Sequence, residues 1–451
     1  MTDYLELAKE VVAQAAQDGV EVEAYIEEGE ETNIRVDGGE VEQLSQSGAK
    51  GLGIRVIDGG RTGYAYTSDF SAESVKTAVQ TAQELAQIVT ADPNRGLPKL
   101  QEIPDEDLDI FDPTLHEVSI EDKIALTKKV EKLSLAGDPR MRQAQAYYGD
   151  GIQHTYLANS KGFAGKYSRT VAYSYVMAFA VDEASGDQAQ GLGLSFSTYY
   201  NELSPEAVAQ EAVYKTTLTL GADSIATQKG TVVFDAMIMG QLLGYIAFAL
   251  NAQSMQRGRS FLIGKMGQEV GSDKVTLLDN GRMKRGMASA PFDAEGVPTS
   301  ATRLIDEGIL QTVIYDTYSA REDEVHSTGN AQRGSYRGQP SPGMSNFYIQ
   351  PGPKSHDEIV AGVENGLYVT RIMQTGGINP ATGDCSMAAS GQLIENGKLT
   401  RPVNGVTVAT TLPELLKNIS EVGSNLRTVP FMGAISAPTV RVDNMTIGGT
   451  E

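Results

Sequence analysis

The chain has 451 residues, of which 40% are apolar and 21% are charged, and its formal net charge is −21. This length exceeds what one hydrophobic core usually organises, so we expect two or three domains. A strongly acidic chain without a basic stripe is repelled by phosphate backbones, which argues against direct contact with DNA or RNA. The single cysteine and an N-terminus without the blocks of a signal peptide predict a cytoplasmic protein.

The first ninety residues predict two helices separated by β-hairpins. Apolar residues at helical spacing predict a helix over 4–18, and Ser71 is placed to cap a second helix that runs to about Gln87. Short β-like segments lie between them, and DGG at 37–39 and again at 58–60 supplies turn residues. We interpret residues 1–90 as an N-terminal α+β domain.

Residues 91–114 carry four prolines and a run of acids without periodicity, which predicts a linker or a surface strap. Helix signals resume at Ser119 and again at Ser204–Pro205, and strand-like segments lie between them. Residues 115–221 are therefore expected to form a middle α+β domain.

Residues 222–451 predict a β-rich C-terminal domain. An apolar stretch at 232–250 is about as long as a membrane span, but Asp235 and Gln241 interrupt it and no basic flanks anchor it. It is expected to be a buried helix, so no contact with a membrane is predicted. Hairpin turns follow, and a late helix is expected from about Leu412 to Val422. The expected fold class is α+β, with antiparallel hairpins in the N-terminal α/β units.

The sequence shows no cluster of metal ligands. The four histidines are far apart and none lies in an HExxH or HExxxH pattern: His116, His154, His326 and His356. Cys385 directly follows Asp384, whose charge would raise the pKa of the thiol. We interpret Cys385 as a small buried side chain without a catalytic role.

Two polar segments are candidates for contact with a substrate or a partner. The loop HSTGNAQRGSY offers donors without apolar cover and is expected to face a cavity or a partner. Arg257 and Arg259 follow the apolar helix and are placed to bind a peptide carboxylate or an acidic side chain. A plainer role is an equally open alternative: these side chains would then cap loops or carry solvated charges. The candidate residues in the loop are His326, Ser327, Thr328, Gly329, Asn330, Arg333 and Tyr336.

Several segments, in unchanged order over about residues 3–449, resemble the TldD/PmbA family. They include RVDGGEVEQLSQSGAKGLGIRV, FDAEGVPTSATRLIDEGIL, HSTGNAQRGSYRGQPSPGMSNFYIQPG, GGINPATGDCSMAASGQLIENGK and PTVRVDNMTIGG. The resemblance implies a cytoplasmic peptidase complex of two related subunits. In that family, TldD-type chains hold a catalytic zinc through an HExxxH helix and a later cysteine, with the glutamate as general base.

This chain departs from the zinc-binding pattern. In the matching helix, MGQLLGYIAFALNAQSMQRGRS, we find Gly, Gln, Leu and Tyr where the histidines and the glutamate belong. The zinc cysteine belongs shortly before the last strand, where Met432–Gly433 is the nearest equivalent, and TGDCSMAASG looks like the PmbA (TldE) branch. The resemblance therefore implies a subunit with no catalytic residue and no metal ligand, with zinc expected in a TldD-like partner.

Three hypotheses follow. The preferred one is a metal-free PmbA/TldE-like subunit that dimerises with a TldD-like chain and helps to process unfolded peptides. The family label "modulator of DNA gyrase" then describes an indirect effect through proteolysis of peptide toxins or antitoxins. The alternatives are a peptidase in its own right, using Cys385 or carboxylates such as Asp293 and Glu295, and a stand-alone peptide-binding homodimer. Whether the chain is itself an enzyme stays open.

Overall fold

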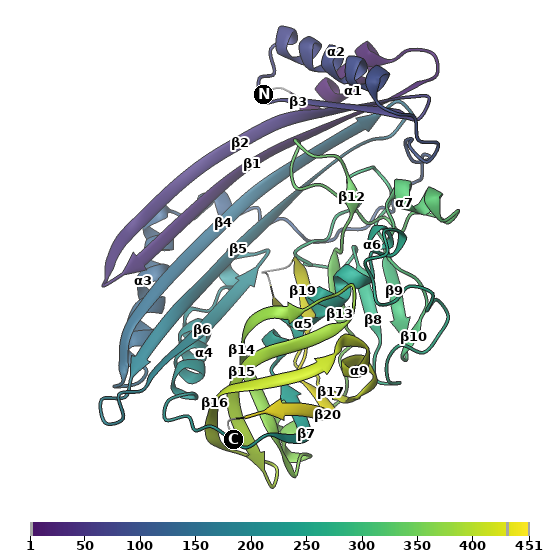
Figure 1. Ribbon diagram of the computed structural model, residues 1–451. Coiled ribbons are helices and arrows are strands. Elements are labelled where there is room, and N and C mark those ends of the chain that lie inside the picture. Colours follow the sequence, from purple (N-terminus) through teal and green to yellow (C-terminus); the bar gives the residue numbers. More distant parts are fainter. Residues whose placement is uncertain (1–2, 430–432, 450–451) are drawn as a thin grey trace.

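A computed structural model describes residues 3–429 and 433–449. The N-terminal half forms one long, curved sheet, and the C-terminal half forms a block of shorter strands and helices on the inner side of that curve (Figure 1). The mixture of helices and antiparallel strands confirms the predicted α+β class.

Six antiparallel strands form the N-terminal sheet in the order β3-β2-β1-β4-β5-β6. β1 comes from the predicted domain at 1–90 and β4 from that at 115–221, so the two predicted units share one sheet; the domain boundaries themselves stay a prediction. The bounds are β1 (Val20–Asp37), β2 (Glu40–Asp58), β3 (Arg61–Thr67), β4 (Met141–Asn159), β5 (Ala164–Val181) and β6 (Gln188–Ser197).

Strands β1 and β2 are longer than the short segments expected, with 18 and 19 residues. The polar stretch of β1 that reads as a break in the sequence, around Glu27–Glu31, is paired on both sides, with β2 and with β4. Gly38 and Gly39 turn the chain between them with φ of 62° and 80°, as the DGG pattern predicts.

Four helices cover the outer face of this sheet. Their starts are capped by Asp3, Ser71, Ser119 and Ser204, whose side chains accept backbone N–H groups of the first turn. α1 packs on β1 and β4, α2 on β2 and β3, α3 mainly on β4 and α4 on β5 and β6. In chain order, each half of the sheet reads α-β-β-β-α. The bounds are α1 (Tyr4–Ala15), α2 (Ala72–Ile88), α3 (Ile120–Ala136) and α4 (Pro205–Thr217).

Two further six-stranded sheets build the C-terminal block, with the orders β10-β9-β8-β13-β19-β18 and β16-β15-β14-β7-β20-β17. In the second sheet β16 also pairs with β20, so the sheet curls back on itself. The strands are β7 (Gln228–Phe234), β8 (Leu277–Asn280), β9 (Ala301–Asp306), β10 (Ile309–Leu310), β11 (Ala331–Gln332), β12 (Ser341–Pro342), β13 (Asn346–Ile349), β14 (Asn365–Ile378), β15 (Asp384–Glu395), β16 (Lys398–Thr411), β17 (Ile419–Val422), β18 (Arg427–Val429), β19 (Ala434–Ala437) and β20 (Val440–Gly448).

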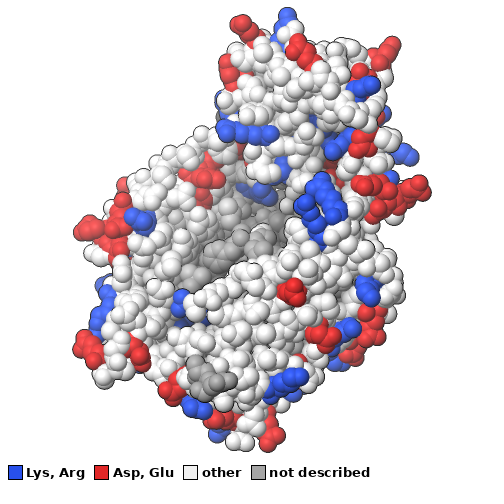
Figure 2. Space-filling model, in the orientation of Figure 1, with Lys and Arg blue, Asp and Glu red and all other residues white. Residues whose placement is uncertain are grey.

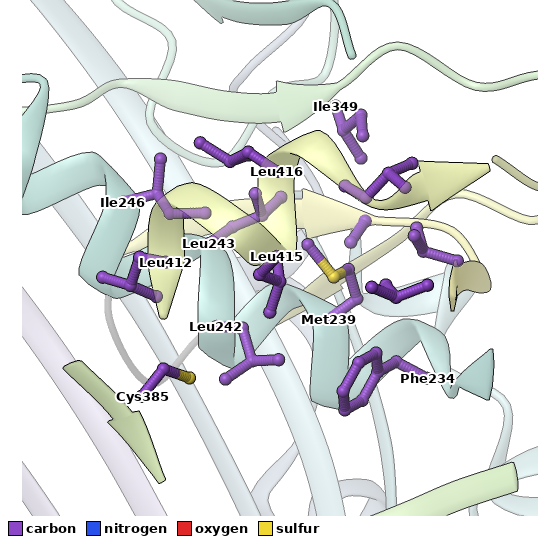
Figure 3. Close-up of a cluster of buried hydrophobic side chains, with 14 of the residues drawn as sticks. Phe234, Met239, Leu242, Leu243, Ile246, Ile349, Cys385, Leu412, Leu415 and Leu416 are labelled. Atoms are coloured by element: carbon purple, nitrogen blue, oxygen red, sulfur yellow. The ribbon is translucent and has the colours of Figure 1, made fainter. Parts of the chain in front are cut away.

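The apolar helix α5 (Ala236–Ala249) lies buried in this block, as predicted. Met239, Leu242 and Leu243 pack in one cluster with Leu412 and Leu416 (Figure 3). Within the described residues, no helix is long and apolar enough to cross a membrane. The other helices here are α6 (Ala252–Gln256), α7 (Thr317–Glu322), α8 (His356–Ala361) and α9 (Leu412–Lys417).

The late helix is shorter than expected. Helix α9 ends at Lys417, and Ile419–Val422 forms β17 instead of a further helical turn. Ile419 and Val422 are buried there and lie opposite Val442 and Val440 of β20. Pairing with the last strand therefore outweighs the local helical pattern.

A glycine on each edge strand allows a helix to lie close to the sheet. A Cβ at Gly63 would overlap the carbonyl oxygen of Ala82 in α2, and a Cβ at Gly193 would overlap that of Val208 in α4. Since backbone lies against backbone at both places, neither contact can be relieved by a change of rotamer.

We therefore predict that Gly193→Ala lowers the free energy of unfolding by about 1–3 kcal/mol, because the added methyl forces α4 away from β6. Urea unfolding followed by circular dichroism measures this change. Gly376→Ala is the matched control, since a Cβ at exposed Gly376 meets nothing within 4 Å. Equal stability of the two variants would contradict the prediction.

Candidate functional site

The molecule is hollowed between the N-terminal sheet and the C-terminal block (Figure 2). Two of the clefts formed by the described residues lie between these parts. The first, of about 600 Å³, is lined by β1, β2, β4 and β5 and by Ser335 and Tyr336 of the predicted loop. The second, of about 580 Å³, is lined by β4, β5, β6, α4, α5 and β14.

Arg333 and Tyr336 of the predicted loop join the block to the sheet. The Arg333 side chain is 1% exposed, forms an ion pair with Glu23 of β1 and lies 4.7 Å from the ring centroid of Tyr25. The backbone N–H of Tyr336 donates to Glu27 at 3.0 Å, and its carbonyl accepts the Tyr64 hydroxyl at 2.7 Å. These two residues therefore come together at the inner face of the sheet, beside the first cleft.

The preceding loop residues mainly hold the loop within the block. The Thr328 hydroxyl accepts the N–H of Tyr315 at 2.8 Å, and the buried Asn330 amide donates to Asp279 at 2.6 Å. Ser327 donates to the carbonyl of Tyr315, and Gly329 adopts a φ of 73° beside Pro298. His326 is exposed, as are Arg257 and Arg259, which follow α6. Substrate or partner contact by any of these residues stays a prediction.

A buried ionic cluster connects β1 and β2 with the C-terminal block. Arg55 donates to Glu23 at 2.7 Å and to Glu295 at 3.0 Å, and Arg333 pairs with the other oxygen of Glu23. All four side chains are at most 6% exposed. Burial alone would lower the pKa of Arg55, but the charges of Glu23 and Glu295 outweigh it and raise that pKa. Arg55 therefore keeps its charge although it is buried.

Of the two carboxyl groups considered for catalysis, Glu295 belongs to this cluster and Asp293 lies two residues before it. Asp293 accepts N–H groups of Glu295, Val297 and Ala331 at 2.9–3.0 Å, and Glu295 accepts Arg55 and the N–H of Thr317. Burial and the charge of Glu295 raise the pKa of Asp293 to about 8. Both carboxylates are nearly inaccessible. Their bonds and burial favour a structural role over a catalytic one.

Cys385 is also poorly suited to catalysis. It is 1% exposed, and Figure 3 shows its side chain among the buried apolar residues of α5 and α9. Burial raises the pKa of the thiol to about 12, so the reactive thiolate is disfavoured at neutral pH.

The face of α5 that would carry metal ligands does not fit a zinc ion. A Cβ at Gly240 would overlap a methyl group of Val429, so no imidazole fits there, and Gln241 and Tyr245 offer only an amide and a phenol. Over residues 3–429 and 433–449, no three His, Cys, Asp or Glu side chains gather as metal ligands do. Met432, the nearest equivalent of the zinc cysteine, lies outside the described residues.

The second cleft borders an open strand edge. Strand β6 pairs with β5 on one side only. At Leu194 the outward backbone groups are bonded by side chains, since its N–H donates to Glu211 at 3.1 Å and its carbonyl accepts Arg427 at 2.9 Å. Because alternate residues of an antiparallel strand direct their backbone groups to the same side, the N–H and carbonyl of Leu192 also point away from β5. Leu192 lines the cleft, and we find no hydrogen-bond partner for these two groups among the described residues.

Comparison with known proteins shows the family. Models of the PmbA/TldA metallopeptidase match in chain order: domain 1 at residues 22–86, the central domain at 113–220 and the C-terminal domain at 227–449. The chain belongs to the PmbA/TldD family. This confirms the resemblance drawn from the sequence, and it makes the chain a relative of metallopeptidases.

Individual members of the PmbA/TldD family match nearly end to end. "Metalloprotease PmbA" of Escherichia coli O157:H7 is 29% identical over 446 residues, which cover 97% of this chain and 94% of that protein. A crystal structure from Thermotoga maritima MSB8, described as a candidate modulator of a DNA gyrase, has a TM-score of 0.90 at 24% identity and covers 99% of this chain and 100% of its own. TldE of Thermococcus kodakarensis has a TM-score of 0.89 at 22% identity, with coverage of 99% and 100%. The two structures show the shared fold.

Sequence reasoning missed the ionic cluster and the second cleft. Glu23, Arg55 and Glu295 are far apart in the sequence, and only the alternation along β1 and β2 hinted that Glu23 and Arg55 share a face. The open edge at Leu192 follows from the strand order, which no local pattern reveals.

We predict that Glu23→Gln lowers the free energy of unfolding by about 3 kcal/mol or more, because two buried guanidinium groups lose their shared carboxylate. Urea unfolding at neutral pH measures the loss. Glu42→Gln is the control, since its exposed pair with Arg35 is expected to contribute less than about 1 kcal/mol. A loss no larger than that of the control would contradict a stabilising role for the cluster.

The raised pKa of Asp293 predicts a pH dependence. The unfolded carboxyl releases its proton near its ordinary pKa while the folded one retains it, so its contribution to stability falls as pH rises from about 4 to 8. Asp293→Asn removes this titration. The advantage of the wild type over the variant in urea midpoint should therefore be larger near pH 5 than near pH 8. An advantage that grows with pH would show that Asp293 is ionised throughout.

Proposed function

We propose that this chain is the metal-free, PmbA/TldE-like partner subunit of a cytoplasmic TldD-type zinc metallopeptidase that acts on unfolded peptides. The observation that carries the proposal is the packing at Gly240. Helix α5 keeps its place in the fold, yet Val429 fills the space that a ligand side chain would need. The hydrolytic zinc then belongs to the TldD-like partner.

The second cleft supports a role in holding peptide. Its open edge at Leu192 offers backbone groups to an extended segment, which would add to β6 as a further strand. A folded protein rarely presents such a segment, because its backbone groups are already paired. A cleft of this kind therefore favours unfolded substrates.

The same cleft is what supports the alternative of a stand-alone peptide-binding homodimer, which would bind without cleaving. A peptidase in its own right is less well supported, because Cys385, Asp293 and Glu295 are all buried and Asp293 and Glu295 are engaged in the fold. The net charge of −21 supports action on DNA gyrase through peptides rather than through contact with DNA.

The test combines zinc analysis with cleavage of a disordered peptide by the purified chain, by a TldD-like chain from the same organism, and by their mixture. We expect less than stoichiometric zinc and no cleavage with this chain alone, and cleavage by the mixture well above that of the TldD-like chain. A mixture with a TldD-like chain whose HExxxH glutamate is replaced by glutamine is the control and should be inactive.

Stoichiometric zinc in the lone chain, or cleavage by it alone, would overturn the proposal. Binding of the peptide by a homodimer, with no effect on the TldD-like chain, would instead establish the stand-alone alternative.

A further inference from the structure

We propose that the second cleft selects peptide segments that carry an aromatic side chain next to an acidic one, with Tyr175 and Arg371 as the specificity-determining residues. This inference rests on the proposed function, because it takes the cleft to be a peptide site. It adds the chemical class of the peptide.

The aromatic preference follows from a row of tyrosines on the inner face of the sheet. Tyr147 and Tyr175 lie opposite each other on β4 and β5, with ring centroids 4.5 Å apart and ring planes 9° from parallel. Tyr173 extends the row, at 6.3 Å from Tyr175. Tyr175 is half-buried and lines both the second cleft and a neighbouring cleft of about 220 Å³. An aromatic side chain in the cleft can therefore pack against the accessible part of the Tyr175 ring, edge to face.

Met177 reinforces this preference. It follows Tyr175 by two residues, so its side chain points to the same face of β5, and it is 52% exposed while lining the same cleft. A flexible thioether beside an aromatic ring is a favourable neighbour for another ring. The floor of the cleft is thus apolar and adaptable around Tyr175.

The acidic preference follows from the charges around the cleft. Although the chain has a net charge of −21, no Asp or Glu lines the second cleft among the residues that the structure describes, and Lys215 and Arg371 are its charged residues there. Lys215 is paired with Glu211 at 2.8 Å and with Asp235 at 3.4 Å. Arg371 contacts only the amide oxygen of Gln190, at 3.5 Å, among the described residues. Its guanidinium is available to a carboxylate of the ligand.

The position of Arg371 relative to the open edge makes the two preferences compatible. Gln190, which it contacts, lies on β6 two residues before Leu192, and both line the cleft. A peptide added along this edge would pass Arg371 while its neighbouring side chains, about 7 Å apart on one face, reach the tyrosine row. One segment can therefore use both contacts.

The test measures binding of dye-labelled, unstructured peptides to the full chain by fluorescence anisotropy. Three peptides differ at one central pair, which is Phe-Glu, Leu-Glu or Phe-Lys. We expect Tyr175→Leu to weaken binding of the Phe-Glu peptide by about threefold to tenfold and to leave the Leu-Glu peptide unchanged. Arg371→Gln should weaken the Phe-Glu peptide by about tenfold, more at low salt, and leave the Phe-Lys peptide unchanged.

Matched controls separate specificity from folding. Tyr175→Phe keeps the ring and should bind as the wild type does. Tyr66→Leu and Arg61→Gln change an exposed tyrosine and an exposed arginine at β3, the opposite edge of the sheet, and should have no effect. If Tyr175→Leu fails to fold, binding of the three peptides by Arg371→Gln tests the inference instead.

The inference would be overturned if the wild type bound the three peptides equally. It would also be overturned if Arg371→Gln bound the Phe-Glu peptide as tightly as the control Arg61→Gln does. A change in sedimentation instead of in peptide binding would overturn it too, because the face would then be an interface between copies of the chain. Cleavage of a Leu-Lys peptide by the mixture with a TldD-like chain tests the proposed function separately. If the mixture cleaves this peptide while the three labelled peptides bind equally, the proposed function stands and only the proposed selectivity of the cleft is refuted.

Discussion

The buried ionic cluster of Glu23, Arg55, Glu295 and Arg333 is the interaction on which the arrangement of this protein depends. Two of its members lie on β1 and β2 and two on the C-terminal block, and the pairs Arg55–Glu295 and Arg333–Glu23 join the two parts. Separating the two parts would take Glu295 from Arg55 and Arg333 from Glu23 at a buried site, which costs far more than loss of an exposed pair. The cluster therefore ties β1 and β2 to the C-terminal block.

The long sheet supplies the other wall of the hollow. Its two halves repeat the order α-β-β-β-α and meet at β1 and β4, and helices cover only the outer face. The inner face consequently keeps polar and aromatic side chains such as Gln153 and Tyr175, which a sheet covered on both sides would replace by aliphatic ones. A half-covered sheet beside a compact block leaves room for an extended ligand.

Apolar packing, rather than metal ligands, holds helix α5 in this member of the PmbA/TldD family. Helix α5 is retained as the centre of an apolar core, where Leu242 and Leu243 pack against α9, while Gly240 is closed off by Val429. Core packing constrains the buried faces of the helix, and it places no demand for His or Glu on the face that would bind zinc. Helix α5 therefore keeps its place in the fold without histidine or glutamate on that face.

The sequence by itself determined the caps at Ser71, Ser119 and Ser204, the hairpin turns, the buried helix α5 and the family, because each rests on neighbouring residues or on a linear pattern. Only the tertiary structure decided that Glu23 meets Arg333, that Val429 fills the space beside Gly240, and that the edge at Leu192 stays open. It also turned Ile419–Val422 from an expected helix into a strand. These outcomes depend on contacts between residues far apart in the chain, whose free energies local patterns do not contain.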